Sequence, residues 1–270
     1  MLRIVILTYE SLYSSMMIAH LAESRPGRIA GIVSSSCIVQ GKGLLGSLRH
    51  VLQRAGPQFF LRKSLETVQY KTLASLWHLL GRPRKVFKIR ELAQKYGLAL
   101  TKSADVNSAP TIAWIRGLQP DLIISVYLNQ WIGPGLLGLA PKGCINIHPA
   151  LLPRHRGLFP YFWVLANGES ETGVSVHIVE PEFDTGDVIA QARIEVSASD
   201  TVQSLSYKSA RVGGDLLVQA VDAIEADAVV RLPQDPALAS YHSWPTSEAY
   251  RRFKRAGRQF GSVRELIQYL

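Results

Sequence analysis

Residues 2–33 read LRIVILTYESLYSSMMIAHLAESRPGRIAGIV, and this stretch predicts the fold. Its first seven residues, LRIVILT (2–8), form a continuous apolar and β-branched run, which is typical of a strand buried on both faces of a parallel sheet. Apolar residues at helical spacing follow over 11–24 and end before Pro26, and IAGIV (29–33) predicts the next strand. A strand, a helix and a second strand in this order indicate a βαβ unit.

The alternation of strands and helices continues through most of the chain. We expect further helices at 90–96, 107–118, 159–167 and 202–225. We expect further strands at 98–101, 121–127, 144–148, 173–180 and 187–196. This order predicts an α/β fold with an open, mostly parallel, Rossmann-like sheet. Ligands of such sheets bind beyond the carboxyl ends of the strands, so we expect a site at the loops after residues 8, 127 and 148.

One region interrupts the pattern and carries most of the charge. The chain has a formal net charge of +9 at pH 7, and residues 41–85 alone hold nine basic residues against one acid, Glu66. Apolar residues recur there at helical spacing from Leu44 to Leu52, and a second helical stretch is predicted over 64–80. We therefore expect a basic helical insertion.

Three interpretations of this insertion stay open at the level of sequence. It is a solvated amphipathic helix pair, it binds an anionic partner such as a membrane surface or a nucleotide-linked sugar, or it contacts tRNA phosphates. Its first residues, GKGLLG (41–46), also match the GxGxxG dinucleotide fingerprint. Because they follow the second strand rather than the first, we interpret them as a flexible turn.

Composition excludes several classes of protein. The chain is 47% hydrophobic and 19% charged, which is typical of a folded globular protein. Cys37 and Cys144 lie far apart and neither belongs to a CxxC pair, so we expect no disulfide scaffold and no metal site. The first apolar run is short, and no run reaches the roughly 18 residues that span a membrane, so the default expectation is a cytoplasmic protein.

Three polar residues near the expected site carry the chemistry. Asn146 and His148 are two apart on one predicted strand, so period-two alternation places both side chains on one face at its carboxyl end. Asp184 lies in the loop between two later strands. An amide that donates to an oxyanion, an imidazole that takes a proton and a carboxylate that orients the imidazole suffice for acyl transfer to an amine.

At these residues the sequence resembles a known family. INIHPALLPRHRG (145–157), ETGVSVH (171–177) and FDTGD (183–187) are similar to the folate-dependent formyltransferases, which include the glycinamide ribonucleotide, methionyl-tRNA and sugar N-formyltransferases. The resemblance is strong over 120–196, weaker over 1–35 and absent over 41–85. It implies a sheet of formyltransferase type, with Asn146, His148 and Asp184 as catalytic residues and 10-formyltetrahydrofolate as formyl donor.

The same resemblance implies where the two substrates bind. Folate is expected against the loop after the fourth strand and the loop 180–184, at Tyr127, Leu128, Asn129, Glu180 and Phe183. The acceptor amine is expected beside the first loop, at Tyr9, Glu10, Tyr13 and Arg156. That loop, TYESLYSS (8–15), lacks the glycines with which phosphate-binding relatives approach an anion, which disfavours glycinamide ribonucleotide. An amino sugar, free or nucleotide-linked, or another small amine metabolite is expected instead.

Several neighbouring polar residues are given structural roles. His155 and His177 have no predicted partner, and we interpret both as structural. Arg154 is interpreted as a solvated loop charge. Asp187 is expected to cap the turn, which leaves Asp184 free.

We therefore predict a formyltransferase domain at 1–200, including the insertion, and a C-terminal helix and extension at 201–270. One alternative is a hydrolase of formyl-folate that uses the same residues on water. A second is an enzyme similar to methionyl-tRNA formyltransferase that lacks a C-terminal barrel. We do not expect tRNA as a partner, because the 40 residues after 230 are too few for such a barrel. The alternative from another class is a non-catalytic nucleic-acid-binding module that uses the insertion.

Overall fold

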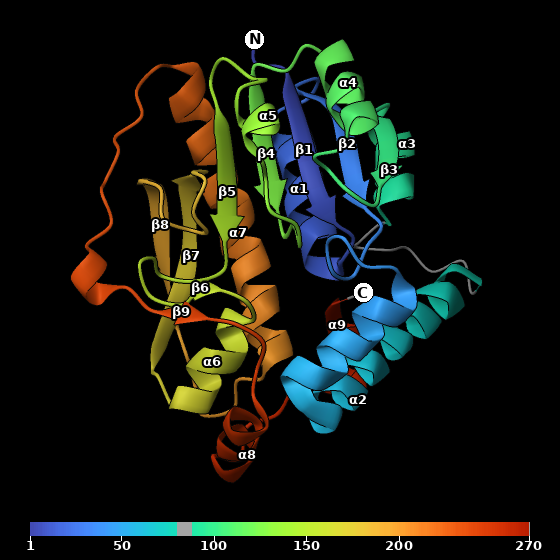
Figure 1. Cartoon of the computed structure of the whole chain (residues 1–270), viewed down its shortest axis with the longest axis vertical. Helices are drawn as coiled ribbons and strands as arrows, with labels where there is room; N and C mark the ends of the chain where they lie inside the picture. The colour runs from blue at the N-terminus through green and yellow to red at the C-terminus, as the bar shows by residue number, and fades with distance from the viewer. Residues whose placement is uncertain (80–87, 270) are drawn as a thin grey trace.

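A seven-stranded sheet organises the chain, of which the computed structural model describes residues 1–79 and 88–269 (Figure 1). In sheet order its strands are β3 (Ala99–Ser103), β2 (Ile29–Ser35), β1 (Ile4–Tyr9), β4 (Leu122–Val126), β5 (Cys144–His148), β7 (Glu171–Ile178) and β8 (Val188–Glu195). The first five are parallel, whereas β7 and β8 form an antiparallel edge. This confirms the predicted open, mostly parallel α/β sheet.

Helices cover both faces of the sheet, which explains the uninterrupted apolar run of β1. Ile4 and Ile6 are fully buried on one face, in a core shared with α1 (Leu12–Ser24), α3 (Ile89–Tyr96) and α7 (Val202–Glu225). Val5 and Leu7 are fully buried on the other face, against α4 (Ala109–Gly117) and α5 (Pro134–Leu137). Successive side chains of a strand point to opposite faces, so only a run without polar residues satisfies both cores.

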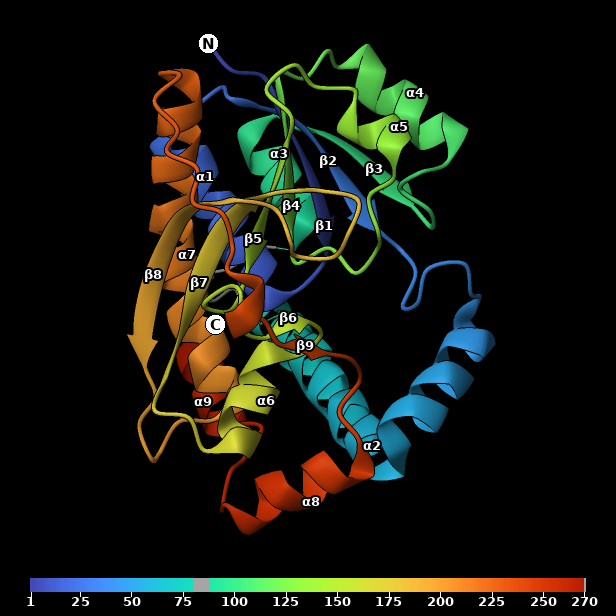
Figure 2. The ribbon, with the colours of Figure 1, turned by 60° about the vertical axis from the view of Figure 1, so that its left-hand side comes forward.

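The insertion forms two helical segments joined at a kink. They are recorded together as α2 (Leu44–Leu79), but Gly56 has a non-helical backbone (φ 77°, ψ 165°) and Pro57 follows it. Proline lacks the backbone N–H that would continue the helix, and glycine tolerates positive φ, so these two residues set the bend. The two segments diverge from this point in Figure 2. The predicted helical insertion is confirmed over 44–79; its residues 80–85 lie outside the described residues.

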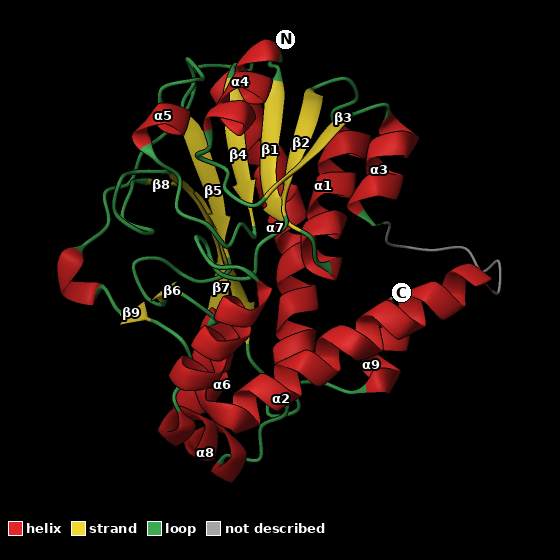
Figure 3. Ribbon diagram, turned by 45° about the vertical axis from the view of Figure 1, so that its right-hand side comes forward, coloured by secondary structure: helices red, strands yellow, loops and turns green. Residues whose placement is uncertain are grey.

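A second, aromatic core lies beyond the carboxyl ends of the parallel strands. Phe59 of α2, Phe162 of α6 (Pro160–Asn167) and Phe253 of α8 (Ser247–Arg255) are buried together there. Figure 3 shows α2, α6, α8 and α9 (Val263–Tyr269) gathered at this end of the sheet. The layer therefore borders the region where ligands of parallel sheets bind.

The C-terminal residues return to the loop that follows β5. After the 3₁₀ helix η1 (Pro236–Leu238), β9 (Tyr241–His242) pairs in parallel with β6 (Arg156–Gly157). This pairing joins the loop that follows β5 to a segment more than 80 residues later in the chain. Gly157 has φ 93°, and a Cβ added there would lie 2.2 Å from the His242 carbonyl oxygen, so glycine permits the close approach.

Within residues 1–79 and 88–269, no helix combines the length and the apolar composition needed to cross a membrane.

Candidate active site

Strand β5 positions the first two residues of the candidate site. It lies between β4 and β7, and Asn146 is paired in register with His177 of β7. Ile145 and Ile147 point into the core of the α1 and α7 face. Asn146 and His148 consequently point the other way, toward the loop that follows β5. His148 is buried and Asn146 is half-buried.

The loop between β7 and β8 brings Asp184 to the same point. Its Oδ1 accepts a long hydrogen bond from Asn146 Nδ2 (3.4 Å), and its Oδ2 lies 3.6 Å from His148 Nδ1. Oδ2 also accepts the Gly157 backbone N–H at 2.8 Å. Asp184 has φ 55°, a left-handed conformation that aspartate tolerates better than most residues. The structure thus brings the three predicted catalytic side chains together.

A backbone carbonyl selects the tautomer of His148. His148 Nε2 lies 2.8 Å from the carbonyl oxygen of His155, which can only accept, so Nε2 carries the proton and donates it there. Nδ1, which faces Asp184, then holds the free lone pair. Burial lowers the pKa of His148, although the Asp184 charge opposes this shift. The imidazole is therefore neutral near pH 7 and can accept a proton at Nδ1.

Asp184 stays ionised despite its burial. Its side chain is 13% exposed, and burial by itself would raise its pKa. His148, His177 and the Gly157 N–H stabilise the carboxylate and hold its pKa below the usual range of an aspartate. A proton gained by His148 Nδ1 would therefore face a fixed negative charge.

His177 belongs to this cluster, which corrects its interpretation as a structural histidine. Its Nδ1 lies 2.8 Å from the Ile178 carbonyl oxygen, so Nδ1 carries the proton and Nε2 accepts from Asn146 Nδ2 at 3.1 Å. Nε2 is also 3.5 Å from Asp184 Oδ1. His177 thereby fixes which way the Asn146 amide faces. The register that places His177 opposite Asn146 was the missing information.

His155 and Arg154 contact acidic side chains. The His155 ring is buried and its Nε2 lies 2.9 Å from Glu169 Oε1, while its carbonyl holds His148. His155 thus orients His148 through its backbone carbonyl, and its structural role stays a prediction. Arg154 is 54% exposed and lies 3.8 Å from Glu171, in accord with a solvated loop charge.

The two loops predicted to bind folate lie side by side. The Trp131 indole N–H donates to the Pro181 carbonyl at 2.9 Å and links them. Phe183 is 54% exposed, which leaves an aromatic face available for a flat ring. Glu180 is also exposed. A pteridine between these loops would thus meet an aromatic and a carboxylate side chain.

The other three predicted folate residues are held inside the fold. Tyr127 is paired with Tyr13 at a ring-centroid distance of 6.4 Å, and burial raises the pKa of its phenol. Leu128 packs against the core of the α4 and α5 face. The Asn129 amide donates to the Cys37 carbonyl at 2.7 Å and accepts from Ser35 at 2.8 Å. These three side chains hold the loop in place, so a ligand would contact the backbone of the loop rather than these side chains.

The predicted acceptor residues lie beside the insertion. Tyr9 and Tyr13 are half-buried and Glu10 is exposed at the end of β1. Burial raises the pKa of Tyr9, and Lys63 of α2 opposes that shift. Leu73 of α2 packs in one cluster with Tyr13. The insertion therefore borders the side of the site where the acceptor is expected.

Arg156 faces the C-terminal strap (residues 231–242), through a residue that sequence patterns did not reveal. Its guanidinium donates to Gln234 Oε1 at 3.1 and 2.7 Å. Gln234 Nε2 donates to the carbonyls of Asp184 (2.9 Å) and Gly186 (2.7 Å). One glutamine thus joins the loop that carries Asp184 to Arg156. Gln234 is 50 residues from Asp184 in sequence, and no motif connects them.

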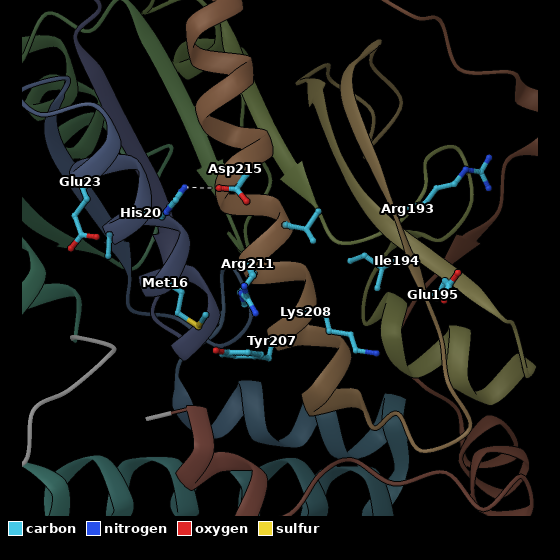
Figure 4. Close-up of a pocket in the computed structure, with 13 residues that line it drawn as sticks. Met16, His20, Glu23, Arg193, Ile194, Glu195, Tyr207, Lys208, Arg211 and Asp215 are labelled. Carbon is cyan, nitrogen blue, oxygen red and sulfur yellow. Dashed lines mark ion pairs between the residues drawn. The ribbon is translucent and has the colours of Figure 1, made fainter.

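A separate open hollow of about 930 Å³ lies between α1, α7 and β8. Figure 4 shows that its labelled side chains are spread along its walls, with one ion pair between His20 and Asp215 at 2.8 Å. His20 is 43% and Asp215 69% exposed, so this pair is solvated. None of the three clustered residues lines this hollow. Among the described residues, no group of three or more histidine, cysteine, aspartate or glutamate side chains is arranged to hold a metal ion.

Known structures share the fold. An N-formyltransferase from Helicobacter canadensis, in complex with folinic acid and dTDP-3-aminofucose, matches with TM-score 0.57 and 14% identity over 90% of this chain and 71% of that one. Glycinamide ribonucleotide transformylase 1 from Symbiobacterium toebii matches with TM-score 0.60 and 20% identity over 87% and 95%.

Relatives found by sequence have a higher identity to this chain, but over a shorter segment. The methionyl-tRNA formyltransferase of Anaeromyxobacter dehalogenans (strain 2CP-C) is 38% identical over 148 residues, which are 55% of this chain and 47% of that protein. The chain spans about half the length of the curated relatives it matches. The family model described as formyl transferase matches residues 77–221, a little over half of the chain. The chain therefore belongs to the formyl transferase family.

Proposed function

We propose that this protein transfers the formyl group of 10-formyltetrahydrofolate to the primary amine of a small acceptor, an amino sugar or another amine metabolite. The observation that carries the proposal is the convergence of Asn146, His148 and Asp184 at the carboxyl end of β5. Each of the three has the protonation state that amine acylation requires. A donor amide, a neutral imidazole and an ionised carboxylate lie close enough together to contact the same reacting group.

The proton transfers follow from the tautomer of His148. When the acceptor nitrogen bonds to the formyl carbon, His148 Nδ1 takes the proton that the nitrogen must lose. His148 then returns a proton to N10 of the folate as the bond between N10 and the formyl carbon breaks. The products are a formamide and tetrahydrofolate, and the imidazole is again neutral. General acid–base catalysis of this kind contributes about 10²–10⁴-fold to the rate.

Asn146 and Asp184 stabilise the charges that develop. The Asn146 amide N–H that makes only a long 3.4 Å contact with Asp184 is available for the formyl oxygen as it becomes negative. One such donor contributes about 10²–10³-fold. His177 holds the amide in the donating orientation. Asp184 stabilises the imidazolium through the 3.6 Å contact with Nδ1.

The folate donor is supported by the site and by the family. The formyl donor supplies an activated one-carbon acyl group, whereas this chain's residues orient the two substrates and take the proton from the acceptor amine. The exposed ring of Phe183 and the loop held by the Trp131–Pro181 hydrogen bond suit a flat heterocycle. The structural neighbour from Helicobacter canadensis is described in complex with folinic acid.

The sugar acceptor is supported by that neighbour's complex with dTDP-3-aminofucose and by the exposed Glu10, whose carboxylate suits an ammonium group. Methionyl-tRNA is a second candidate, because a methionyl-tRNA formyltransferase is 38% identical to this chain over 148 residues. Water in place of the amine would make the protein a hydrolase. These acceptors require separate assays.

The proposal is tested by following folate absorbance after mixing the full chain with 10-formyltetrahydrofolate and one acceptor. The acceptors are dTDP-3-amino and dTDP-4-amino sugars, glycinamide ribonucleotide, methionyl-tRNA and none. We expect turnover with an amino sugar, abolished by Asn146→Ala and by His148→Gln.

Other outcomes are equally informative. Equal turnover without any amine would identify a hydrolase, and turnover confined to methionyl-tRNA would identify the second candidate. Full activity of the His148→Gln variant would refute the mechanism. Asn167→Ala, at the end of α6, is the matched control for Asn146→Ala and is expected to keep wild-type activity.

A further inference from the structure

The outward face of the second segment of α2 is apolar. Leu61, Leu65, Val68 and Leu76 are 64%, 48%, 59% and 45% exposed. Their spacing of four, three and eight residues places them on one side of a helix. Large apolar side chains that are exposed singly are ordinary, but a stripe along about four helical turns indicates a surface that another molecule covers.

The first segment of α2 adds positive charge beside exposed leucines. Leu45 and Leu52 are 81% and 43% exposed, and Arg49 is exposed between them at i, i+4 spacing. Arg54 is also exposed. The sole acid in the sequence from 44 to 79 is Glu66, which pairs with Lys63 at 2.9 Å. The two segments together thus offer leucines and uncompensated cations.

We propose that α2 docks this protein on an anionic lipid bilayer. Apolar side chains flanked by Lys and Arg are what an interfacial helix inserts between lipid headgroups. A second copy of the chain would bring the same cations against themselves, and like charges oppose that contact. RNA phosphates would pair with the arginines, but RNA would leave the leucines exposed to water. An anionic lipid surface pairs with the arginines through its headgroups and removes the leucines from water.

The place of α2 in the molecule fits this role. Both segments lie at the lower right edge of the molecule in Figure 1, on the other side from β7 and β8. Another side of the second segment packs through Leu73 onto Leu12 and Tyr13, which follow β1. Docking through the outer face would therefore place the loop after β1 about one helix diameter, roughly 10 Å, from the lipid.

The docking is tested by flotation of the full chain with vesicles, without folate or amine, so its result is independent of formyl transfer. Vesicles of phosphatidylcholine alone are compared with vesicles that also contain phosphatidylglycerol. We expect binding to the anionic vesicles that weakens with added salt. Arg49→Gln with Arg54→Gln should lower the partition coefficient about fivefold for each arginine.

The leucines are tested in a second variant. Leu61→Ser, Leu65→Ser and Val68→Ser together should abolish binding, because these side chains supply the inserted surface. The matched controls are Leu238→Ser and Arg116→Gln, which change an exposed leucine and an exposed arginine on other elements and should bind as wild type.

Three results would overturn the proposal. One is equal or absent binding to the two kinds of vesicle. Another is concentration-dependent dimerisation, measured by light scattering, that the serine variant loses, since this would assign the face to a second copy. The third is salt-dependent binding of the protein to RNA, if the serine variant keeps this RNA binding and also binds vesicles as well as the wild type does.

Discussion

Asp184→Asn isolates the electrostatic part of the proposed mechanism. Asparagine keeps the shape of the side chain and tolerates the left-handed backbone at φ 55°. It can still accept the Gly157 N–H through its oxygen. What it removes is the negative charge beside His148.

The magnitude follows from one distance. Two unit charges 3.6 Å apart, as at His148 Nδ1 and Asp184 Oδ2, interact by about 5 kcal/mol at an effective dielectric constant near 20. Part of this interaction is present in the transition state, when the imidazole is partly protonated. If half or more is expressed, kcat falls by about 10²–10³-fold.

The assay measures kcat and KM for both substrates with the most active acceptor, alongside a circular dichroism spectrum. Asp187→Asn is the matched control: it changes a carboxylate of the same loop outside the cluster and should alter the rate by no more than about twofold. A folded Asp184→Asn variant with kcat within tenfold of wild type would refute the role of the carboxylate. A loss of the native spectrum would instead assign Asp184 to folding, and His148→Gln would then be the remaining test of the mechanism.

Three further predictions follow from the same contacts. Because burial lowers the pKa of His148, kcat/KM should fall only at a pH below that at which an ordinary histidine titrates, as Nδ1 gains a proton. Asp184→Asn removes a charge that raises this pKa, so the acidic limb of the pH–rate profile should move to still lower pH. An unmoved limb would exclude His148 as the base. Gln234→Ala and Gln234→Glu both remove the N–H donors to the carbonyls of Asp184 and Gly186. Each variant should therefore have a kcat about tenfold lower, with little change in melting temperature. Wild-type kcat in both variants would show that Gln234 contributes only packing. Gly157→Ala should reduce the free energy of unfolding by about 1–3 kcal/mol in urea titrations. The control is Gly143→Ala, because Gly143 also has a positive φ but has open space around it, so its loss should be smaller. Equal losses in the two variants would contradict the tight β6–β9 contact.

The sequence anticipated the features that are local in the chain. Apolar runs marked the strands, period-two alternation placed Asn146 and His148 on one face, and the FDTGD turn located Asp184. These patterns are visible because side-chain direction in a strand depends only on position along it. The family resemblance then connected residues whose separation in sequence is conserved by a shared fold.

The sequence was less informative wherever a contact joins distant segments. His177 gained its role from the antiparallel pairing of β5 with β7, which sets it opposite Asn146. The tautomer of His148 depends on a carbonyl seven residues away, held by the turn of the 149–158 loop. Gln234 reaches Asp184 because β9 returns to pair with β6.

Sequence by itself therefore determined the class of the sheet, the basic helical insertion and the identity of three clustered side chains, because apolar periodicity and side-chain alternation are properties of neighbouring residues in the chain. The tertiary structure alone decided which nitrogen of His148 is free, which way the Asn146 amide faces and which face of α2 remains uncovered. Those properties depend on hydrogen-bond partners and neighbours that chain folding brings together, from seven residues away for His148 and 31 for Asn146, and a linear pattern does not encode their geometry.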